Sequence, residues 1–289
     1  MSLAPELVPR LKIALRAAET AGAILMSHFA ERTRPGKRLI ADEKSSIDLV
    51  TAADRASEAC ILGELRAAFP DDALLGEEQD GKDAIARIAA AQRADPARLC
   101  WVVDPLDGTT NFAHGHLQFG VSIGLLRGTE PVLGVVFAPA RREIFVGGEG
   151  LRATCNGEGI GVSGIGALEQ ALLGTGFPYD RRDHLPALLA RVGEALRCSQ
   201  GVRRAGSAAL DLCELAAGRL DGFWEERLAP WDLTAGCAIL DAAGGRRTDA
   251  GGAAHDVFGA ATVASNGLVH GALLELLAIA DAEAASRAR

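Results

Sequence analysis

The stretch Trp101-Val-Val-Asp104-Pro-Leu-Asp107-Gly-Thr-Thr-Asn-Phe112 decides how the rest of the chain is interpreted. It belongs to an apolar run that begins at Leu99, is typical of a buried strand, and stops on two aspartates. Carboxylates at the end of a buried strand raise the free energy of the folded state unless a cation pairs with them. Mg²⁺ prefers oxygen ligands and is therefore a candidate. The Gly-Thr-Thr that follows is typical of a turn that opens a helix and offers free N–H groups to an anion. An ordinary Asp-Pro/Asp-Gly turn explains this stretch equally well.

Composition bounds the class of protein. The chain has 289 residues, of which 48% are hydrophobic and 24% charged, as in an ordinary globular protein with a sizeable core. The net charge of −8 argues against direct nucleic-acid binding through phosphate neutralisation. We see no signal-peptide pattern and no membrane span. The six cysteines show no C-x-x-C spacing, which favours small buried side chains in a reducing, cytoplasmic compartment.

The hydrophobic pattern divides the chain into two halves that differ in the order of their predicted helices and strands. The first half predicts helices over 7–29 and 52–69, a hairpin or loop over 37–46, and a strand over 47–51. Strands over 119–126, 131–138, 143–147 and 151–155 then follow as an antiparallel series that closes at the hairpin signal Asn156-Gly157. The second half alternates strands with helices. We therefore predict two packed subdomains, 1–155 and 156–289, with most of the acidic candidates in the first.

A second strand also ends on acids. The segment 73–76 predicts a short buried strand that runs directly into Glu77-Glu78. Asp54 follows the 47–51 strand, and with Thr51 it also has the form of a capping box that would serve only the next helix. Acids at several strand ends indicate one shared cluster.

The second half holds further candidates, each with an adequate local explanation. Ser207 lies in a Gly-Ser turn after Arg203-Arg204, where it could bind a polar ligand or simply cap a helix. Asp232 falls in a first helical turn, which the helix dipole favours regardless of function. Glu225 ends the strand between them. Every one of these acids can be explained alone, but the set as a whole indicates a site.

With these pieces assembled, the chain resembles the inositol monophosphatase family of lithium-sensitive, magnesium-dependent phosphatases. The matching motifs span about 40–250 and are Lys44-Ser45-Ser46 with Asp48-Leu-Val-Thr-Ala-Ala-Asp54, Gly76-Glu77-Glu78, the Trp101–Phe112 stretch, Gly206-Ser207-Ala208-Ala209, and Pro230-Trp231-Asp232 with Ala243-Gly244-Gly245. The resemblance implies an α/β (α+β) layered αβαβα sandwich with mixed and antiparallel sheets, and a homodimer. It implies magnesium-dependent hydrolysis of myo-inositol monophosphate to inositol and phosphate.

The resemblance also implies residue roles. Two or three Mg²⁺ ions per site would be held by Glu77, Asp104, the Leu106 carbonyl, Asp107 and Asp232, with Asp104 bridging two of them. The catalytic set would be Glu77, Thr109 and Asp54, in which Asp54 holds the Thr109 hydroxyl and both Glu77 and Thr109 orient the attacking water. The substrate-binding set would be Glu77, Leu106, Asp107, Gly108, Thr109, Arg203, Gly206, Ser207, Ala208, Glu225 and Asp232.

Other substrates and a second class of function stay open. Relatives that cleave histidinol phosphate or adenosine bisphosphate vary the Thr110-Asn111 pair, so Thr-Thr-Asn-Phe favours inositol monophosphate. A fructose bisphosphatase would need a basic pocket, for which Arg203-Arg204 is the candidate. The resemblance also permits a non-enzymatic role as a partner of the transcription machinery. The intact set of carboxylates argues that catalysis is retained.

Overall fold

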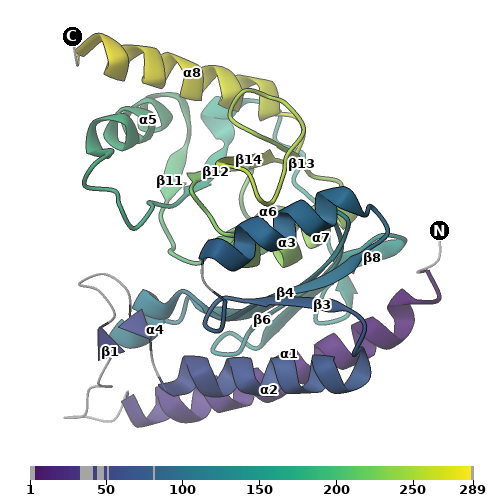
Figure 1. Cartoon of the computed structure of the whole chain (residues 1–289). Coiled ribbons are helices and arrows are strands. Elements are labelled where there is room, and N and C mark those ends of the chain that lie inside the picture. The colour runs from purple at the N-terminus through teal and green to yellow at the C-terminus, as the bar shows by residue number, and fades with distance from the viewer. Residues whose placement is uncertain (1–3, 33–41, 44–48, 51, 81, 288–289) are drawn as a thin grey trace.

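The computed structural model describes residues 4–32, 42–43, 49–50, 52–80 and 82–287. Helices and sheets alternate through the molecule in five layers, helix–sheet–helix–sheet–helix (Figure 1). The fold class predicted from the sequence is confirmed. Of the predicted 37–46 hairpin and 47–51 strand, the described part is β1 (Asp42–Glu43) paired antiparallel with β2 (Leu49–Val50), and the rest lies outside the described residues.

The larger sheet has seven strands in the order β3-β4-β5-β6-β7-β8-β9. Strand β3 pairs parallel with β4, and every later neighbour pairs antiparallel. Short turns join the consecutive strands from β5 to β9, whereas α4 lies between β4 and β5. Asn156 and Gly157, at φ 52° and 81°, form the predicted turn between β8 and β9. The bounds are β3 (Ala73–Gly76), β4 (Leu99–Asp107), β5 (Gly120–Arg127), β6 (Glu130–Ala138), β7 (Glu143–Gly148), β8 (Leu151–Cys155) and β9 (Glu158–Gly159).

Helices cover both faces of this sheet, which is why β4 to β6 read as nearly continuous apolar runs. On one face lie α1 (Leu7–Arg32) and α2 (Ala52–Ala68), and on the other α6 (Ala208–Ala216) and α7 (Pro230–Ala242). Trp101, Phe112 and Phe119 are fully buried on the α1 and α2 side. The seven-stranded sheet is thus buried between two helical layers.

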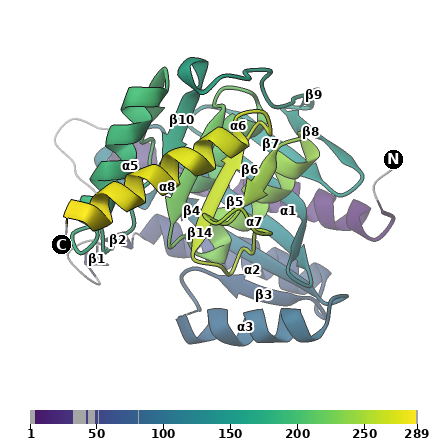
Figure 2. The same ribbon diagram turned by 90° about the horizontal axis from the view of Figure 1, so that it is seen from above.

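The smaller sheet has five strands in the order β11-β10-β12-β14-β13. Its inner face packs on the α6 and α7 layer, and α5 (Leu185–Cys198) and α8 (His270–Arg287) form the outer layer (Figure 2). The remaining bounds are α3 (Lys82–Ala94), α4 (Thr109–His114), η1 (Leu168–Gln170), β10 (Leu172–Thr175), β11 (Gly201–Arg203), β12 (Gly222–Glu226), β13 (Arg246–Thr248) and β14 (Ala261–Ser265).

The chain passes from one sheet to the other between β9 and β10, close to the predicted subdomain boundary at 155/156. Helices α6 and α7 belong to the second half of the chain but pack on the sheet built by the first half. The division into 1–155 and 156–289 therefore stays a prediction. Within the described ranges, no helix combines the length and the apolar character needed to cross a bilayer.

Candidate active site

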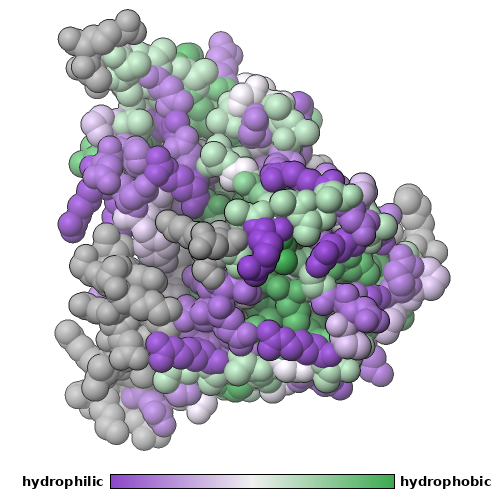
Figure 3. Space-filling view, in the orientation of Figure 1, coloured by the Kyte–Doolittle hydropathy of each residue, from purple (hydrophilic) through white to green (hydrophobic). Residues whose placement is uncertain are grey.

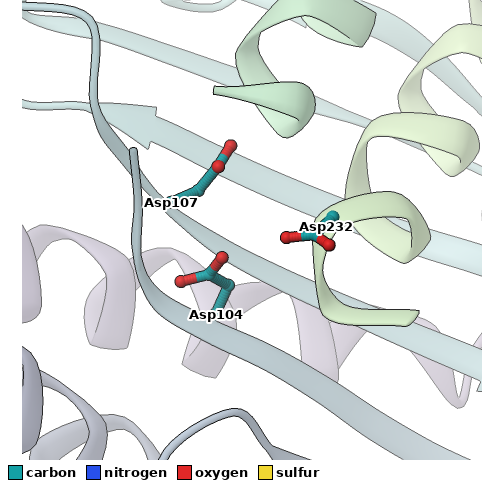
Figure 4. Close-up of side chains that lie close together, drawn as sticks. All are labelled: Asp104, Asp107 and Asp232. Carbon is teal, nitrogen blue, oxygen red and sulfur yellow. The ribbon is translucent and has the colours of Figure 1, made fainter. Parts of the chain in front are cut away.

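Three aspartates from two elements meet at the end of β4. Asp104 and Asp107 lie among the last four residues of that strand, and Asp232 lies in the first turn of α7 (Figure 4). One carboxylate oxygen from each lies within 4.8 Å of the others. The pairing of β4 with β5 breaks between Asp104 and Asp107, and such irregularities re-aim side chains. Beside this break, the Asp104 and Asp107 carboxylates lie near that of Asp232 at the start of α7 (Figure 4).

These carboxylates are held by N–H and O–H donors that leave other oxygens available. The Leu106 N–H donates to Asp104 Oδ1 at 2.8 Å. Asp107 Oδ2 accepts from Ser207 Oγ at 2.6 Å and from the Ala209 N–H at 2.8 Å, at the start of α6. The Ala229 N–H donates to Asp232 Oδ2 at 2.7 Å. The backbone thus fixes the orientation of each acid.

The electrostatics of the cluster call for a cation. Burial, and then the neighbouring acids, raise the pKa of Asp104 and of Glu77 well above the usual carboxyl range. Burial raises the pKa of Asp107 to about 6 and that of Asp232 to about 7. A buried group of like charges is stable in ionised form only when paired. The donor set consists of oxygens alone, so the residues present fit Mg²⁺.

Glu77 joins the cluster from β3. Its N–H donates to the Val103 carbonyl at 3.2 Å, which extends the parallel pairing of β3 with β4 and brings the two strand ends together. Glu58 supports this turn, since its Oε1 accepts from the Glu78 N–H at 2.9 Å. A Cβ on Gly76 would lie 2.4 Å from that oxygen. Neither Glu58 nor Gly76 was identified as a supporting residue from the sequence, because the contact joins α2 to β3.

Gly108 forms the predicted turn between β4 and α4. Its φ is +90°, and a Cβ there would lie 2.8 Å from the Gln118 carbonyl oxygen, so only glycine fits. Thr109 opens the helix, and its hydroxyl donates to the Leu106 carbonyl at 3.0 Å. Asp54 is 1% exposed, and its charge contributes to the raised pKa of Glu77. The predicted hold of Asp54 on Thr109 stays a prediction.

A cavity of about 570 Å³ opens beside the three aspartates. Glu225 on β12 is 9% exposed and lines it, and a Cβ on Gly176 would lie 2.0 Å from Glu225 Oε2. Gly176 therefore leaves the space that the Glu225 carboxylate occupies. Predicted residues that line the cavity are Asp107, Gly108, Thr109, Gly206, Ser207, Ala208, Glu225 and Asp232.

Arg203 was predicted to bind substrate, but its neighbour Arg204 is the one that lines the cavity. Successive side chains of an extended segment point to opposite sides. Arg203 is exposed on β11, whereas the Arg204 guanidinium lies over the Phe177 ring, 5.6 Å from its centroid. Arg203 thus does not line this cavity, and its role in substrate binding stays a prediction.

Asn111 on α4 connects the segment before β5 to the turn before α6. Its side-chain amide donates to the carbonyls of Gln118 at 2.7 Å and Ala205 at 2.8 Å. The first contact is local to the α4 region, and the second holds the turn that carries Gly206 and Ser207. Asn111 belongs to the sequence motif, but the motif does not indicate this bridging contact.

The arrangement combines a buried acidic cluster, a helix-opening glycine turn and a polar cavity, as a metal-dependent phosphatase requires. The family model for the "Inositol monophosphatase family" matches residues 6–285. An inositol-1-monophosphatase of Synechocystis sp. is 40% identical over 93% of this chain and 88% of its own. A protein of Pseudomonas aeruginosa named Nus factor SuhB is 42% identical over 83% and 85%. The solved inositol monophosphatase of Anabaena (Nostoc) sp. is 39% identical, with a TM-score of 0.78 over 94% and 96% of the two chains.

The chain therefore belongs to the inositol monophosphatase family.

Proposed function

We propose that this protein is a magnesium-dependent phosphomonoesterase that hydrolyses myo-inositol monophosphate to inositol and phosphate. The observation that carries the proposal is the convergence of Asp104, Asp107 and Asp232 beside the Gly108 turn, at one edge of a single cavity. Relatives with the name inositol-1-monophosphatase, matched over most of the chain, support the choice of substrate.

The metal-binding set that we propose is Glu77, Asp104, the Leu106 carbonyl, Asp107 and Asp232. Mg²⁺ held there would supply Lewis acidity that activates water and stabilises the departing alkoxide. The proposal is for two or three ions in each site. The three aspartates contribute by presenting fixed oxygens, since each is already oriented by a backbone N–H or by Ser207.

Side chains and backbone N–H groups of the chain would perform the remaining steps of catalysis and binding. Glu77 would accept the proton of the attacking water at its carboxylate, and the Thr109 hydroxyl would orient that water. The N–H groups of Gly108 and Thr109 would bind the phosphate oxygens at the start of α4. Glu225 would accept a hydrogen bond from a hydroxyl of the alcohol inside the cavity. No covalent intermediate with the protein is required.

The test is phosphate release with excess Mg²⁺ and with a chelator, on a panel of small esters. The panel is myo-inositol 1-phosphate, histidinol phosphate, adenosine 3′,5′-bisphosphate and fructose 1,6-bisphosphate. Preference for the inositol ester, lost on chelation and regained with Mg²⁺, is the expected result. Preference for another ester would keep the reaction and change the substrate, and no turnover on any ester would overturn the proposal.

A role in transcription is the second candidate. The relative from Pseudomonas aeruginosa that bears the name Nus factor SuhB is 42% identical to this chain, which supports a protein partner in the transcription machinery. We also propose a homodimer, as the family resemblance implies. A cytoplasmic location is proposed because all six cysteines are free. Binding of the purified protein to RNA polymerase, measured with and without the Asp104→Asn substitution, would separate this role from catalysis.

A further inference from the structure

Helix α2 buries polar side chains in its first half, at the end that lies beside the acidic cluster. The buried residues of its second half are apolar, as expected for a helix packed on a sheet. Those of its first half include Asp54, Ser57 and Glu58, each no more than 2% exposed. The solvent side of α2 also carries hydrophilic side chains, which lie along the lower part of the molecule (Figure 3). The polar residues on the buried side need partners inside the protein.

Ser57 binds the part of β4 that carries two of the aspartates. Its hydroxyl donates to the Pro105 carbonyl at 2.9 Å. Pro105 lies within the break in the β4–β5 register between Asp104 and Asp107, where the pairing gives it no partner on β5. Ser57 therefore supplies a hydrogen bond in place of the neighbouring strand.

Glu58, the next residue on α2, binds the turn that follows β3. Its Oε1 accepts from the Glu78 N–H at 2.9 Å and from the Gln79 N–H at 3.4 Å. Successive N–H groups of this kind form a concave site for an anion. Burial raises the pKa of the Glu58 carboxyl group, and the two N–H groups oppose that shift because they bind the ionised form. The carboxylate and the turn therefore fix each other's position.

Ser57 and Glu58 are neighbours in the chain, yet they bind the ends of two different strands. Backbone pairing joins these strands as far as the Glu77 N–H, which donates to the Val103 carbonyl at 3.2 Å. Past that point, the turn after β3 and the break in β4 are both attached to a single turn of α2. Groups that bind one metal centre must be held to within about 0.5 Å. A helical turn that binds both strand ends can hold them at a constant separation.

We propose that Ser57 and Glu58 are positioning residues that set the spacing of the metal-binding carboxylates, so that Mg²⁺ affinity depends on both although neither is a ligand. The inference rests on the proposed function and its metal-binding set, and it adds two residues outside the cavity. Both act through main-chain atoms of the two strand ends. An apolar residue at either position would continue the buried stripe of α2, so packing alone does not require a hydroxyl and a carboxylate there.

The test is isothermal titration of Mg²⁺ into the metal-free protein, with Tm and phosphate release measured alongside. Glu58→Ala leaves two N–H groups without their acceptor, and we expect the Kd for Mg²⁺ to rise about tenfold. Ser57→Ala removes one neutral hydrogen bond and should raise the Kd about threefold. It carries little risk to folding, because alanine favours a helix. Saturating Mg²⁺ should return kcat to within about twofold of the wild-type value in both variants.

Glu58→Gln separates the effect of position from that of charge. Its amide oxygen can still accept from the two N–H groups, so we expect a Kd within about twofold of wild type. A rise equal to that of Glu58→Ala would assign the effect to charge and overturn the proposal. The matched control is Glu64→Gln, which removes the same charge from the same helix but breaks an ion pair with Arg16 instead. The control should keep the wild-type Kd, and an equal rise there would also overturn the proposal.

The remaining outcomes distinguish this inference from the proposed function. An unchanged Kd in Ser57→Ala and Glu58→Ala, with only the Tm lowered, would show that both residues serve the fold alone. If Glu58→Ala does not fold, Ser57→Ala decides. Wild-type protein that binds Mg²⁺ but hydrolyses no ester would overturn the proposed function, and the Kd values would still decide the positioning role. Wild-type protein that binds no Mg²⁺ would overturn both.

Discussion

The acidic cluster at the cavity, here called the acidic wall, differs from the arginines of the cavity, here called the basic wall, in burial, in support and in origin. The acidic wall is Asp104, Asp107 and Asp232, and the basic wall is Arg181, Arg182 and Arg204. Asp104 and Asp107 are 2% and 7% exposed and are held by backbone N–H groups or a buried serine, whereas Arg182 and Arg204 are exposed. The acids lie on strand and helix ends in the centre of the fold, and the arginines lie on connecting segments. A buried charge must have a defined partner, so the acidic wall determines the chemistry.

The largest expected effect comes from neutralising the acidic wall. Asp104→Asn should lower kcat by about a hundredfold to a thousandfold, because it removes a charged ligand from the centre of the cluster. The same change should raise the Tm of the metal-free protein, since the neighbouring acids already raise the pKa of Asp104. Phosphate release and thermal unfolding without metal are the measurements. Near-normal turnover would remove Asp104 from the proposed metal site.

A smaller effect should follow from filling the space beside Gly176 that the Glu225 carboxylate occupies. Gly176→Ala places a methyl group where the Glu225 carboxylate lies, so we expect kcat/KM for the inositol ester to fall about tenfold, mainly through KM. Gly193→Ala on α5 is the control, because nothing lies within 4 Å of its Cβ. The control should keep its activity and gain up to about 1 kcal/mol of stability. Equal kinetics in the two variants would show that Glu225 does not contact the substrate.

Removing the Asn111 side-chain amide should lower activity and stability together. Asn111→Ala leaves the carbonyls of Gln118 and Ala205 without the amide that bridges them. We expect a loss of about 1–3 kcal/mol in the free energy of unfolding and a severalfold fall in kcat/KM. Denaturant unfolding and steady-state kinetics measure the two effects. An unchanged kcat/KM with the full loss of stability would mean that the walls are aligned by other contacts.

The smallest expected effect is a pH dependence of stability that arises at His255, in the segment between β13 and β14. Burial lowers the pKa of His255 to about 4, and Arg247 Nη1, 3.0 Å from Nδ1, keeps the ring neutral. The unfolded chain takes up a proton near pH 6.5 and the folded one does not, so stability falls as the pH drops from about 6.5 toward 4. The Tm of the Mg²⁺-saturated protein should drop by several degrees between pH 7 and 5, and His255→Gln should flatten this slope. An unchanged slope would assign it to other groups.

Local patterns explain why much of the acidic wall could be predicted from the sequence. An apolar run that stops on Asp104 and Asp107, followed by Gly108 at positive φ, encodes strand, bulge and turn within one stretch. The turn at Asn156-Gly157 was predictable for the same reason. The strand boundaries elsewhere shifted by only a residue or two, as for β5 and β6.

The basic wall could not be predicted in this way, because its geometry depends on distant contacts. Nothing around Gly176 in the sequence reports that Glu225 will occupy the adjacent space. Arg203 ends β11 and Arg204 follows it, and only the folded structure shows that Arg204 is the one that lines the cavity. Glu58 supports the Glu77 turn only because α2 packs beside β3. Such residues become visible when the packing is known.

The hydrogen bond from Ser207 to Asp107 joins groups that are 100 residues apart in the chain. Most of the seven-stranded sheet pairs neighbouring strands and has low contact order, so it can form early in folding. The complete carboxylate cluster forms only after α6 and α7 have docked on that sheet. The recovery of high-affinity Mg²⁺ binding during refolding would therefore report the last step of assembly, later than the recovery of secondary structure.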